Sequence, residues 1–300
     1  MLRVGTDCSG IEAPIQALQN LRIPFRHVFS CEKDEHCMES LVANYTPEHL
    51  FSDMTDRDNK KLPDIDIYIC GFPCQPFSNA GYRQGMQDEK GRGNLFWYCL
   101  DVIATKLPYY FILENVKGLV TIDNGNTFDT IIKELSSVGY TVYWNVLNTK
   151  DYGIPQQRER LYMVGIRSDI KQTFTWPEHK PMKSLESFID VENNERETIP
   201  EFVKRSGLLK HIPKDSLFID IGFTQSNFVN SGVVCPCITT QGNLWCVPMK
   251  RHASNEECLS LQGFPRSFKQ VVSDRQFKKQ IGNSMSVNVL EEIFKNLLLQ

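Results

Sequence analysis

Residues 65–78 read Ile65-Asp66-Ile67-Tyr68-Ile69-Cys70-Gly71-Phe72-Pro73-Cys74-Gln75-Pro76-Phe77-Ser78. The apolar run 65–70 predicts a short buried strand. The strand cannot continue through Pro73, because proline has no backbone N–H to donate to a sheet. Cys74 is therefore expected on a stiff turn at the carboxyl end of a strand, where an open α/β sheet binds its ligands. We interpret Cys74 as a candidate nucleophile, since a structural cysteine more often lies within a strand, as expected for Cys70.

Strand and helix signals alternate on both sides of this stretch. The expected strands are 2–6, 25–31, a weaker one ending near 51–53, 65–70, 109–113, 141–147 and 160–165, and the expected helices are 11–21, 35–44, 95–107 and 127–138. This alternation predicts an α/β fold with a Rossmann-like, doubly wound and mostly parallel sheet. The pattern weakens after residue 177 and an amphipathic helix returns over 285–299. We expect one domain from 1–177 plus 278–300 and a smaller domain of mixed or β structure from 178–277.

Composition and charge narrow the class of protein. The chain has no apolar stretch long enough to span a bilayer, and its first residues are too polar for a signal peptide, so we expect a soluble intracellular protein without a membrane partner. The formal net charge of −3 does not by itself indicate a nucleic-acid binder, so any such site requires a local basic lining. The ten cysteines lack the spacing of a zinc site, and we expect free thiols and no metal.

Polar or reactive residues follow each of the first five expected strands. In strand order they are the stretch 6–11, Glu32, the pair Asp53-Met54, Cys74, and the pair Glu114-Asn115. Parallel strands place their carboxyl ends at one edge of a sheet, so these groups are expected to line a common edge.

The first two groups suggest a nucleoside site. Gly10 lies in a turn that lets the backbone approach a ligand closely, and Glu32 follows about 20 residues later, where an acidic residue holds ribose hydroxyls in nucleoside-binding folds. The alternative is an exposed surface glutamate. Glu12 interrupts the glycine pattern that cradles phosphates and would repel a pyrophosphate, so a nucleoside without phosphates fits better. Asp53 could bond an adenine amino group or only cap its own loop.

The fourth and fifth strands are sequential, so Cys74 and Glu114 are expected to face one cavity. A free thiol has a pKa of about 8.5 and needs activation. Arg158 and Arg160, which lead into another strand, could supply positive charge there; the alternative is a solvated strand end.

Seven motifs, in order and over nearly the whole length, resemble those of single-chain cytosine-5 DNA methyltransferases of the bacterial, phage and viral kind. They are residues 6–11, 31–34, 71–78, 113–116, 152–160, 257–265 and 280–284. The resemblance implies the fold of class I methyltransferases and methyl transfer from S-adenosylmethionine to carbon 5 of cytosine in a short duplex DNA sequence. S-adenosylhomocysteine is then the product.

The resemblance also implies catalytic roles. Cys74 would add to ring carbon 6 as a thiolate, which makes carbon 5 nucleophilic. Glu114 would bond ring nitrogen 3 and the amino group, and Arg160 would bond the carbonyl oxygen and hold Glu114, with Arg158 also in the catalytic set. The cytosine must be flipped out of the duplex to reach them.

The remaining site residues follow from the same resemblance. The expected cofactor residues are Cys8, Ser9, Gly10, Ile11, Glu32, Asp53, Met54, Leu95 and Asn283. The expected DNA-contacting residues are Gln75, Ser78, Arg92, Thr239 and Thr240, with Arg92 in a glycine-rich loop over 79–93 that closes on DNA. Residues 178–277 would read the DNA sequence. We expect a monomer that acts on double-stranded DNA, with a cognate restriction endonuclease as a possible partner.

Two alternatives stay open. A branch of this family methylates transfer RNA, but the chain lacks the Cys-Phe-Thr signature of that branch in its second half. A non-catalytic DNA- or cofactor-binding relative would have no need for Cys74, Glu114 and Arg160 together.

Overall fold

A computed structural model describes residues 1–73, 95–193, 196–198, 201, 204, 212–222 and 232–299. The chain divides into two compact units. The first unit holds Met1–Leu147, Glu159–Trp176 and Ile293–Gln300, and the second holds Asn148–Arg158 and Pro177–Glu292. The assignment of DNA recognition to 178–277 stays a prediction.

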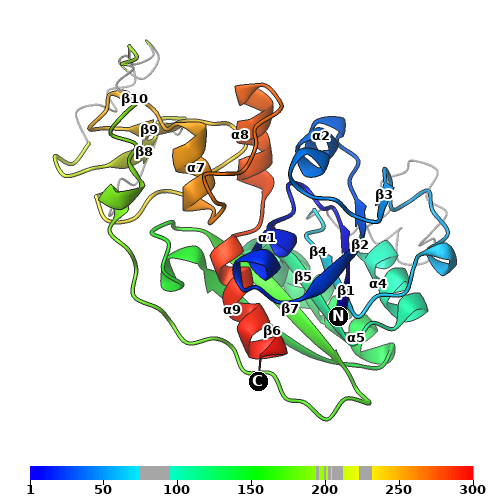
Figure 1. Cartoon of the computed structure of the whole chain (residues 1–300). Helices are drawn as coiled ribbons and strands as arrows, with labels where there is room; N and C mark the ends of the chain where they lie inside the picture. The colour runs from blue at the N-terminus through cyan, green and yellow to red at the C-terminus, as the bar shows by residue number, and fades with distance from the viewer. Residues whose placement is uncertain are drawn as a thin grey trace. The chain divides into compact units, whose positions relative to one another are not determined.

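The first unit is built on a seven-stranded sheet (Figure 1). The strands lie in the order β3 (His49–Phe51), β2 (Phe25–Cys31), β1 (Leu2–Asp7), β4 (Ile67–Cys70), β5 (Tyr110–Val116), β7 (Glu159–Arg167) and β6 (Tyr140–Asn148). Strands β1 to β5 pair in parallel, and β7 pairs antiparallel with β5. The predicted doubly wound and mostly parallel sheet is confirmed.

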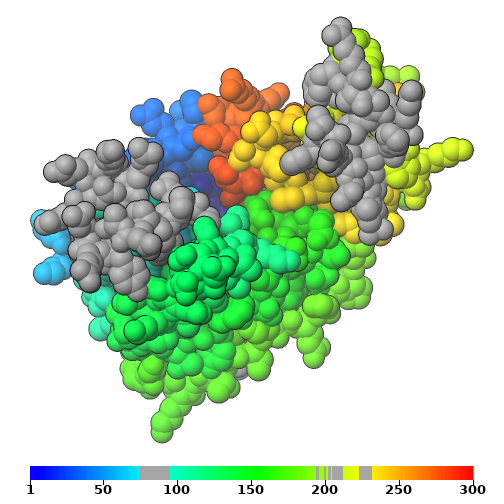
Figure 2. All heavy atoms as spheres, turned by 180° about the vertical axis from the view of Figure 1, so that it is seen from behind, coloured from blue at the N-terminus to red at the C-terminus, as the bar shows by residue number. Residues whose placement is uncertain are grey.

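Strand β4 shows why both faces of the sheet must be covered. Tyr68 and Cys70 point into a core cluster that α4 (Leu95–Lys106) and α5 (Asn126–Ser137) share, while Ile67 and Ile69 alternate to the other face and are equally buried. Helix α1 (Ala13–Asn20) lies on that other face (Figure 1). The short helices η2 (Lys117–Val120) and η3 (Ile122–Gly125) precede α5, and in the reverse view the residues coloured teal to green form one continuous surface (Figure 2).

The other elements of the first unit connect strand ends. Helix α2 (Glu35–Asn44) starts at Asp34, whose carboxylate accepts from two backbone N–H groups of the first turn, and η1 (Asn59–Lys61) precedes β4. Residues Ile293 onward of α9 (Val287–Leu298) also belong to this unit.

The second unit has a small antiparallel sheet of β8 (Phe218–Asp220), β9 (Leu244–Cys246) and β10 (Arg251–His252). The second unit also contains α7 (Asn255–Leu261), α8 (Asp274–Asn283), the start of α9 up to Glu292, and two 3-10 turns, η4 (Thr149–Asp151) and η5 (Leu185–Phe188). Neither α7 nor α8 was expected from the sequence. A capping box starts α7, because Ser254 and Glu257 each bond the other's backbone N–H.

Among the described residues, no helix combines the length and the apolar character that crossing a membrane would require.

Candidate active site

The carboxyl ends of the central strands are level, which brings the expected groups to one edge of the first unit. Asp7 pairs with Cys31 on one side and Cys70 on the other, and Cys70 pairs with Leu113. The residues directly after these positions are the candidate site residues.

The loop after β1 is fastened to the end of β2. Ser9 donates from its backbone N–H to the Cys31 carbonyl oxygen at 3.1 Å, and its hydroxyl accepts from the Cys31 N–H at 3.0 Å. Gly10, at φ 53°, donates its N–H to a Glu32 carboxylate oxygen at 2.7 Å. Cys8 is half-buried and Ile11 is buried. The structure therefore brings this loop and Glu32 together.

The Glu32 carboxylate is held by main-chain donors. Its second oxygen accepts from the Asp34 N–H at 2.8 Å. Burial raises the pKa of Glu32, although hydrogen bonds from the backbone of Asp34 and Gly10 oppose the shift. A carboxylate has about four lone-pair directions, so this one can still accept hydrogen bonds from the hydroxyls of a ligand.

Glu12 does not face a ligand, and the expectation that it would repel a pyrophosphate is wrong. Its side chain is fully buried, and one carboxylate oxygen accepts from the hydroxyls of Thr6 and Ser30, both at 2.6 Å. His27 lies 3.3 Å from the same oxygen. The Glu12 carboxylate therefore accepts hydrogen bonds inside the sheet edge and does not project from the loop.

The next groups at this edge are the largely apolar side chains of Cys8, Met54 and Leu95 and the carboxylate of Asp53. Cys8 Sγ lies 3.9 Å from Met54 Sδ, and Leu95 packs against the same core cluster as both. Asp53 caps its own loop by accepting from the N–H and hydroxyl of Thr55. Burial opposes ionisation of Asp53, but the hydrogen bonds from Lys33 and Thr55 outweigh it and lower its pKa.

A supporting ion pair at this edge was not expected from the sequence. Arg57 donates to Asp7 with Nη1 at 2.7 Å, and the Tyr68 hydroxyl donates to the other Asp7 oxygen at 2.6 Å. The guanidinium also lies over the rings of Phe29 and Phe51, at 5.2 and 5.4 Å from their centres. The pair anchors the residue that starts the loop after β1. Only the presence of an arginine shortly after Asp53 could have indicated it.

Glu114 and Arg160 meet across the β5–β7 pair. Glu114 is paired with Tyr162 and Val116 with Arg160, so Glu114 and Arg160 are diagonal neighbours on one face. Arg160 Nε lies 3.3 Å from Glu114 Oε1, and both side chains are largely buried. The pairing keeps a carboxylate and a guanidinium at a fixed separation.

Asn115 ties β5 to the turn that follows β4. Its side-chain amide donates to the Phe72 carbonyl oxygen at 2.8 Å, two residues before position 74. Cys74, Gln75, Ser78 and Arg92 themselves lie outside the described residues. The structure therefore brings the approach to Cys74 into contact with Asn115, the residue after Glu114, and the thiol's own position stays a prediction.

The other expected residues lie in the second unit. Arg158 is buried, and its guanidinium donates to backbone carbonyl oxygens of that unit, which favours a structural role over the predicted catalytic one.

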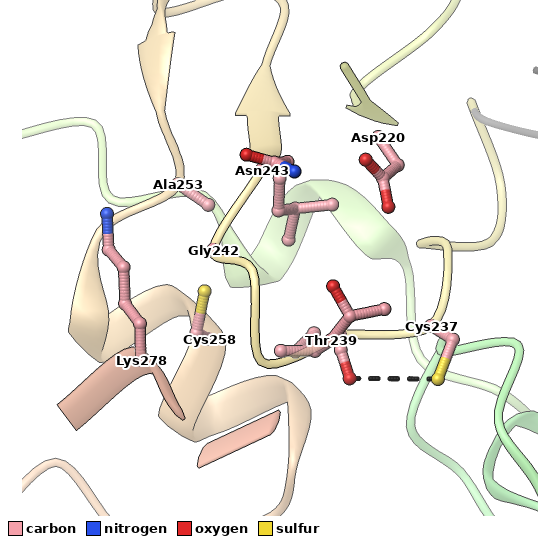
Figure 3. Close-up of a pocket in the computed structure, with 10 residues that line it drawn as sticks. Asp220, Cys237, Thr239, Gly242, Asn243, Ala253, Cys258 and Lys278 are labelled. Carbon is pink, nitrogen blue, oxygen red and sulfur yellow. Dashed lines mark hydrogen bonds between the residues drawn. The ribbon is translucent and has the colours of Figure 1, made fainter. Parts of the chain in front are cut away.

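Thr239 lines a small pocket together with Cys237, Cys258 and Lys278 (Figure 3). Its volume of about 10 Å³ holds no more than about one water molecule, so it is not a cofactor site.

A larger hollow of about 990 Å³ lies beside this pocket. Its lining includes Thr240 and Asn283 together with the basic residues Arg275, Lys278 and Lys279. These side chains give the unit a local basic surface. No cluster of metal-ligating side chains occurs in the described part of the chain.

Comparison with known proteins identifies the family. The family model described as C-5 cytosine-specific DNA methylase matches residues 7–299. The chain belongs to this family. Among curated relatives of the methylase, the type II methyltransferase M.NgoBI of Neisseria gonorrhoeae is 38% identical over 275 residues, which cover 88% of this chain and 84% of the relative. M.HaeII of Haemophilus aegyptius is 37% identical over 281 residues, covering 91% and 86%. The methylase is a DNA (cytosine-5)-methyltransferase.

Solved structures agree with the fold of the methylase. A DNMT2 variant from Spodoptera frugiperda superposes with a TM-score of 0.75 at 19% identity and covers 99% of both chains. A putative DNA modification methyltransferase from a prophage of E. coli gives the same TM-score and identity, over 99% of this chain and 98% of that one. The expected methyltransferase fold is confirmed.

Proposed function

We propose that the methylase transfers a methyl group from S-adenosylmethionine to carbon 5 of a cytosine flipped out of duplex DNA, through a covalent adduct with Cys74. The observation that carries this proposal is the Glu114–Arg160 pair at the end of β5, beside the turn that leads to Cys74. A carboxyl and a guanidinium at fixed separation match the donor and acceptor edge of cytosine.

The proposed steps use the chain's own residues. The Cys74 thiolate adds to carbon 6, and Glu114 stabilises the ring as charge develops on it. Arg160 bonds the carbonyl oxygen and holds the Glu114 carboxyl in place. After carbon 5 is methylated, its proton is lost to a base and Cys74 leaves carbon 6 as a thiolate, which restores the aromatic ring and the free nucleophile.

The sheet edge suits the nucleoside part of S-adenosylmethionine, which when bound supplies an electrophilic methyl group. Glu32 offers carboxylate oxygens to ribose hydroxyls, and Met54 and Leu95 offer an apolar wall to the adenine. Ser9 and Gly10 hold the loop in place, and Asn283 would contact the methionine part. Asp53 would bond the adenine amino group with an oxygen not used by Thr55.

DNA is the proposed partner. Thr240 borders the hollow that holds Arg275, Lys278 and Lys279, whose charges suit phosphate groups. We propose that 178–277 reads the sequence, that Gln75, Ser78, Arg92 and Thr239 contact DNA near the flipped base, and that the enzyme acts inside the cell as a monomer. The type II relatives suggest a cognate restriction endonuclease.

Radiolabelled methyl transfer tests the substrate class. We expect label from S-adenosylmethionine in unmethylated duplex DNA and none in transfer RNA. Label in transfer RNA alone would overturn the DNA assignment, and label in neither would favour the non-catalytic relative. Bisulfite sequencing of the labelled DNA would give the recognition site.

A further inference from the structure

Arg158 joins two segments of the second unit that lie far apart in the sequence. Its Nη1 donates to the Ile238 carbonyl oxygen at 3.0 Å, and its Nη2 donates to the carbonyl oxygens of Gly282 at 3.0 Å and Ser284 at 2.6 Å. Arg158 is 2% exposed. A guanidinium is planar and presents its donors in a fixed fork. These contacts therefore fix both the distance and the angle between the segment at Ile238 and the segment from Gly282 to Ser284.

Direct backbone packing holds the same two segments together. A Cβ added at Gly282 would lie 2.5 Å from the carbonyl carbon of Thr239 and 2.6 Å from the backbone nitrogen of Thr240. Main-chain atoms cannot rotate away as side chains can. Only glycine therefore allows this approach, and the last turn of α8 has no room to slide over the stretch 238–240.

Buried amides complete the connection. Gln156 accepts from the Ile238 N–H at 3.2 Å and donates to the Leu261 carbonyl oxygen at 2.8 Å. Gln262, also in contact with the Gln156 side chain, donates to the Ile281 carbonyl oxygen at 2.8 Å. Each segment is thus held by a second polar group besides Arg158, and the groups belong to one network.

The two segments carry different proposed contacts. Thr239 is half-buried and Thr240 is exposed, and both are expected to meet DNA. Asn283 is exposed between the buried residues Gly282 and Ser284, and it is expected to meet the cofactor. A displacement of Asn283 must also move the neighbouring carbonyl groups of Gly282 and Ser284. Arg158 bonds these groups and also the Ile238 carbonyl group, so the displacement reaches the DNA-contacting stretch.

We propose that Arg158 is a positioning residue that couples cofactor binding at Asn283 to DNA binding at Thr239 and Thr240. This inference rests on the proposed function, because it takes both ligand assignments from it. The coupling is reciprocal: each ligand strengthens binding of the other by the same factor.

The test compares two equally buried arginines. R158K keeps the positive charge but replaces the fork with a single ammonium group, which cannot reach all three carbonyl groups. The control R251K changes an arginine that is also 2% exposed in the same unit, but Arg251 bonds Glu257 at 2.8 and 2.9 Å and the Asp190 carbonyl oxygen. The loss of stability should be similar in both variants, and the loss of coupling should be confined to R158K.

The readout is the Kd of S-adenosylhomocysteine, measured by calorimetry with and without a saturating duplex that contains a site methylated by the wild type. The ratio should be about fivefold or more in the wild type and in R251K. It should fall below about twofold in R158K. A wild-type ratio near one, or an unchanged ratio in R158K, would overturn the proposal.

A second measurement needs no variant. Hydrogen exchange of wild-type amides is followed with and without S-adenosylhomocysteine, in the absence of DNA. We expect slower exchange at 238–240 when the cofactor product binds and no change at 251–257. Unchanged exchange at 238–240 would contradict the coupling. If the wild type binds neither ligand, the proposed function itself fails, which is a different outcome.

Discussion

The sheet edge of the first unit and the stretches 238–240 and 281–284 of the second unit hold their functional residues in different ways. At the sheet edge, parallel pairing of β1, β4 and β5 levels the strand ends, and side chains such as Glu114 are available for chemistry. In the second unit, buried side chains such as Arg158 and Gln262 bond carbonyl groups in the last turn of α8. Strand pairing therefore places polar side chains at the sheet edge, whereas the second unit uses buried polar side chains to hold its backbone segments together.

The largest expected effect is the loss of methyl transfer when Cys74 is replaced, and it tests whether the chemistry takes place at the sheet edge. In Cys74→Ser, methyl transfer should fall at least about 1,000-fold, because a hydroxyl is a far weaker nucleophile than a thiolate near neutral pH. Binding of S-adenosylhomocysteine should be unchanged by calorimetry. Cys37→Ser, in α2, is the control and should keep its activity. Full activity in Cys74→Ser would refute the covalent adduct.

The buried Asp7–Arg57 ion pair tests how much buried charge contributes to the stability of the sheet edge. Arg57→Met should lower the free energy of unfolding by about 3 kcal/mol, because Asp7 would remain buried without its partner. Arg26→Met removes the exposed pair with Glu48 and should lower the free energy of unfolding far less, because solvent screens that pair. Urea unfolding measures both. Equal losses would show that the buried pair adds nothing beyond a surface pair.

Glu114→Gln separates charge from shape at the end of β5. The amide keeps the size of the carboxyl but loses its attraction to Arg160 and to the developing charge, so single-turnover methyl transfer should slow about 100-fold. DNA binding in a gel-shift assay should persist. Glu159→Gln removes a solvent-exposed carboxylate that pairs with Lys117 at the same strand junction. Its rate should stay within about twofold of the wild type, and similar slowing in both variants would remove the role assigned to Glu114.

The smallest expected effect is a pH dependence of cofactor binding. The folded-state pKa of Glu32 is raised, so its ionised form, which accepts ribose hydroxyls, is lost as the pH falls through that raised value. The Kd of S-adenosylhomocysteine should therefore increase as the solution becomes acidic. The linked effect on folding has the opposite sense, since the apo protein gains stability on protonation of Glu32. Glu32→Gln should bind more weakly and with a flatter pH profile, and an unchanged profile would contradict the assignment.

The sequence predicted the first unit well because its signals are periodic. The expected ranges 25–31 and 35–44 coincide with β2 and α2, and the strand ends that carry Glu32 and Glu114 follow from the alternation alone. The Asp7–Arg57 pair could not be predicted, because Arg57 lies in a loop without periodicity. The sequence predicted neither α7 nor α8. Helix α7 has only seven residues, and its buried Arg251–Glu257 pair leaves no trace in an apolar pattern.

Glu12 has one further consequence. It adopts a left-handed backbone conformation, φ 60° and ψ 49°, that a glycine would accept without strain, yet its carboxylate is the acceptor for Thr6 and Ser30. Exchange of Glu12 alone for glycine would relax the main chain but remove the shared acceptor of these two hydroxyls, leaving Thr6 with Ser9 and Ser30 with His27 as partners. Thr6, Glu12, His27 and Ser30 should therefore change together among homologues, as a set inherited in common.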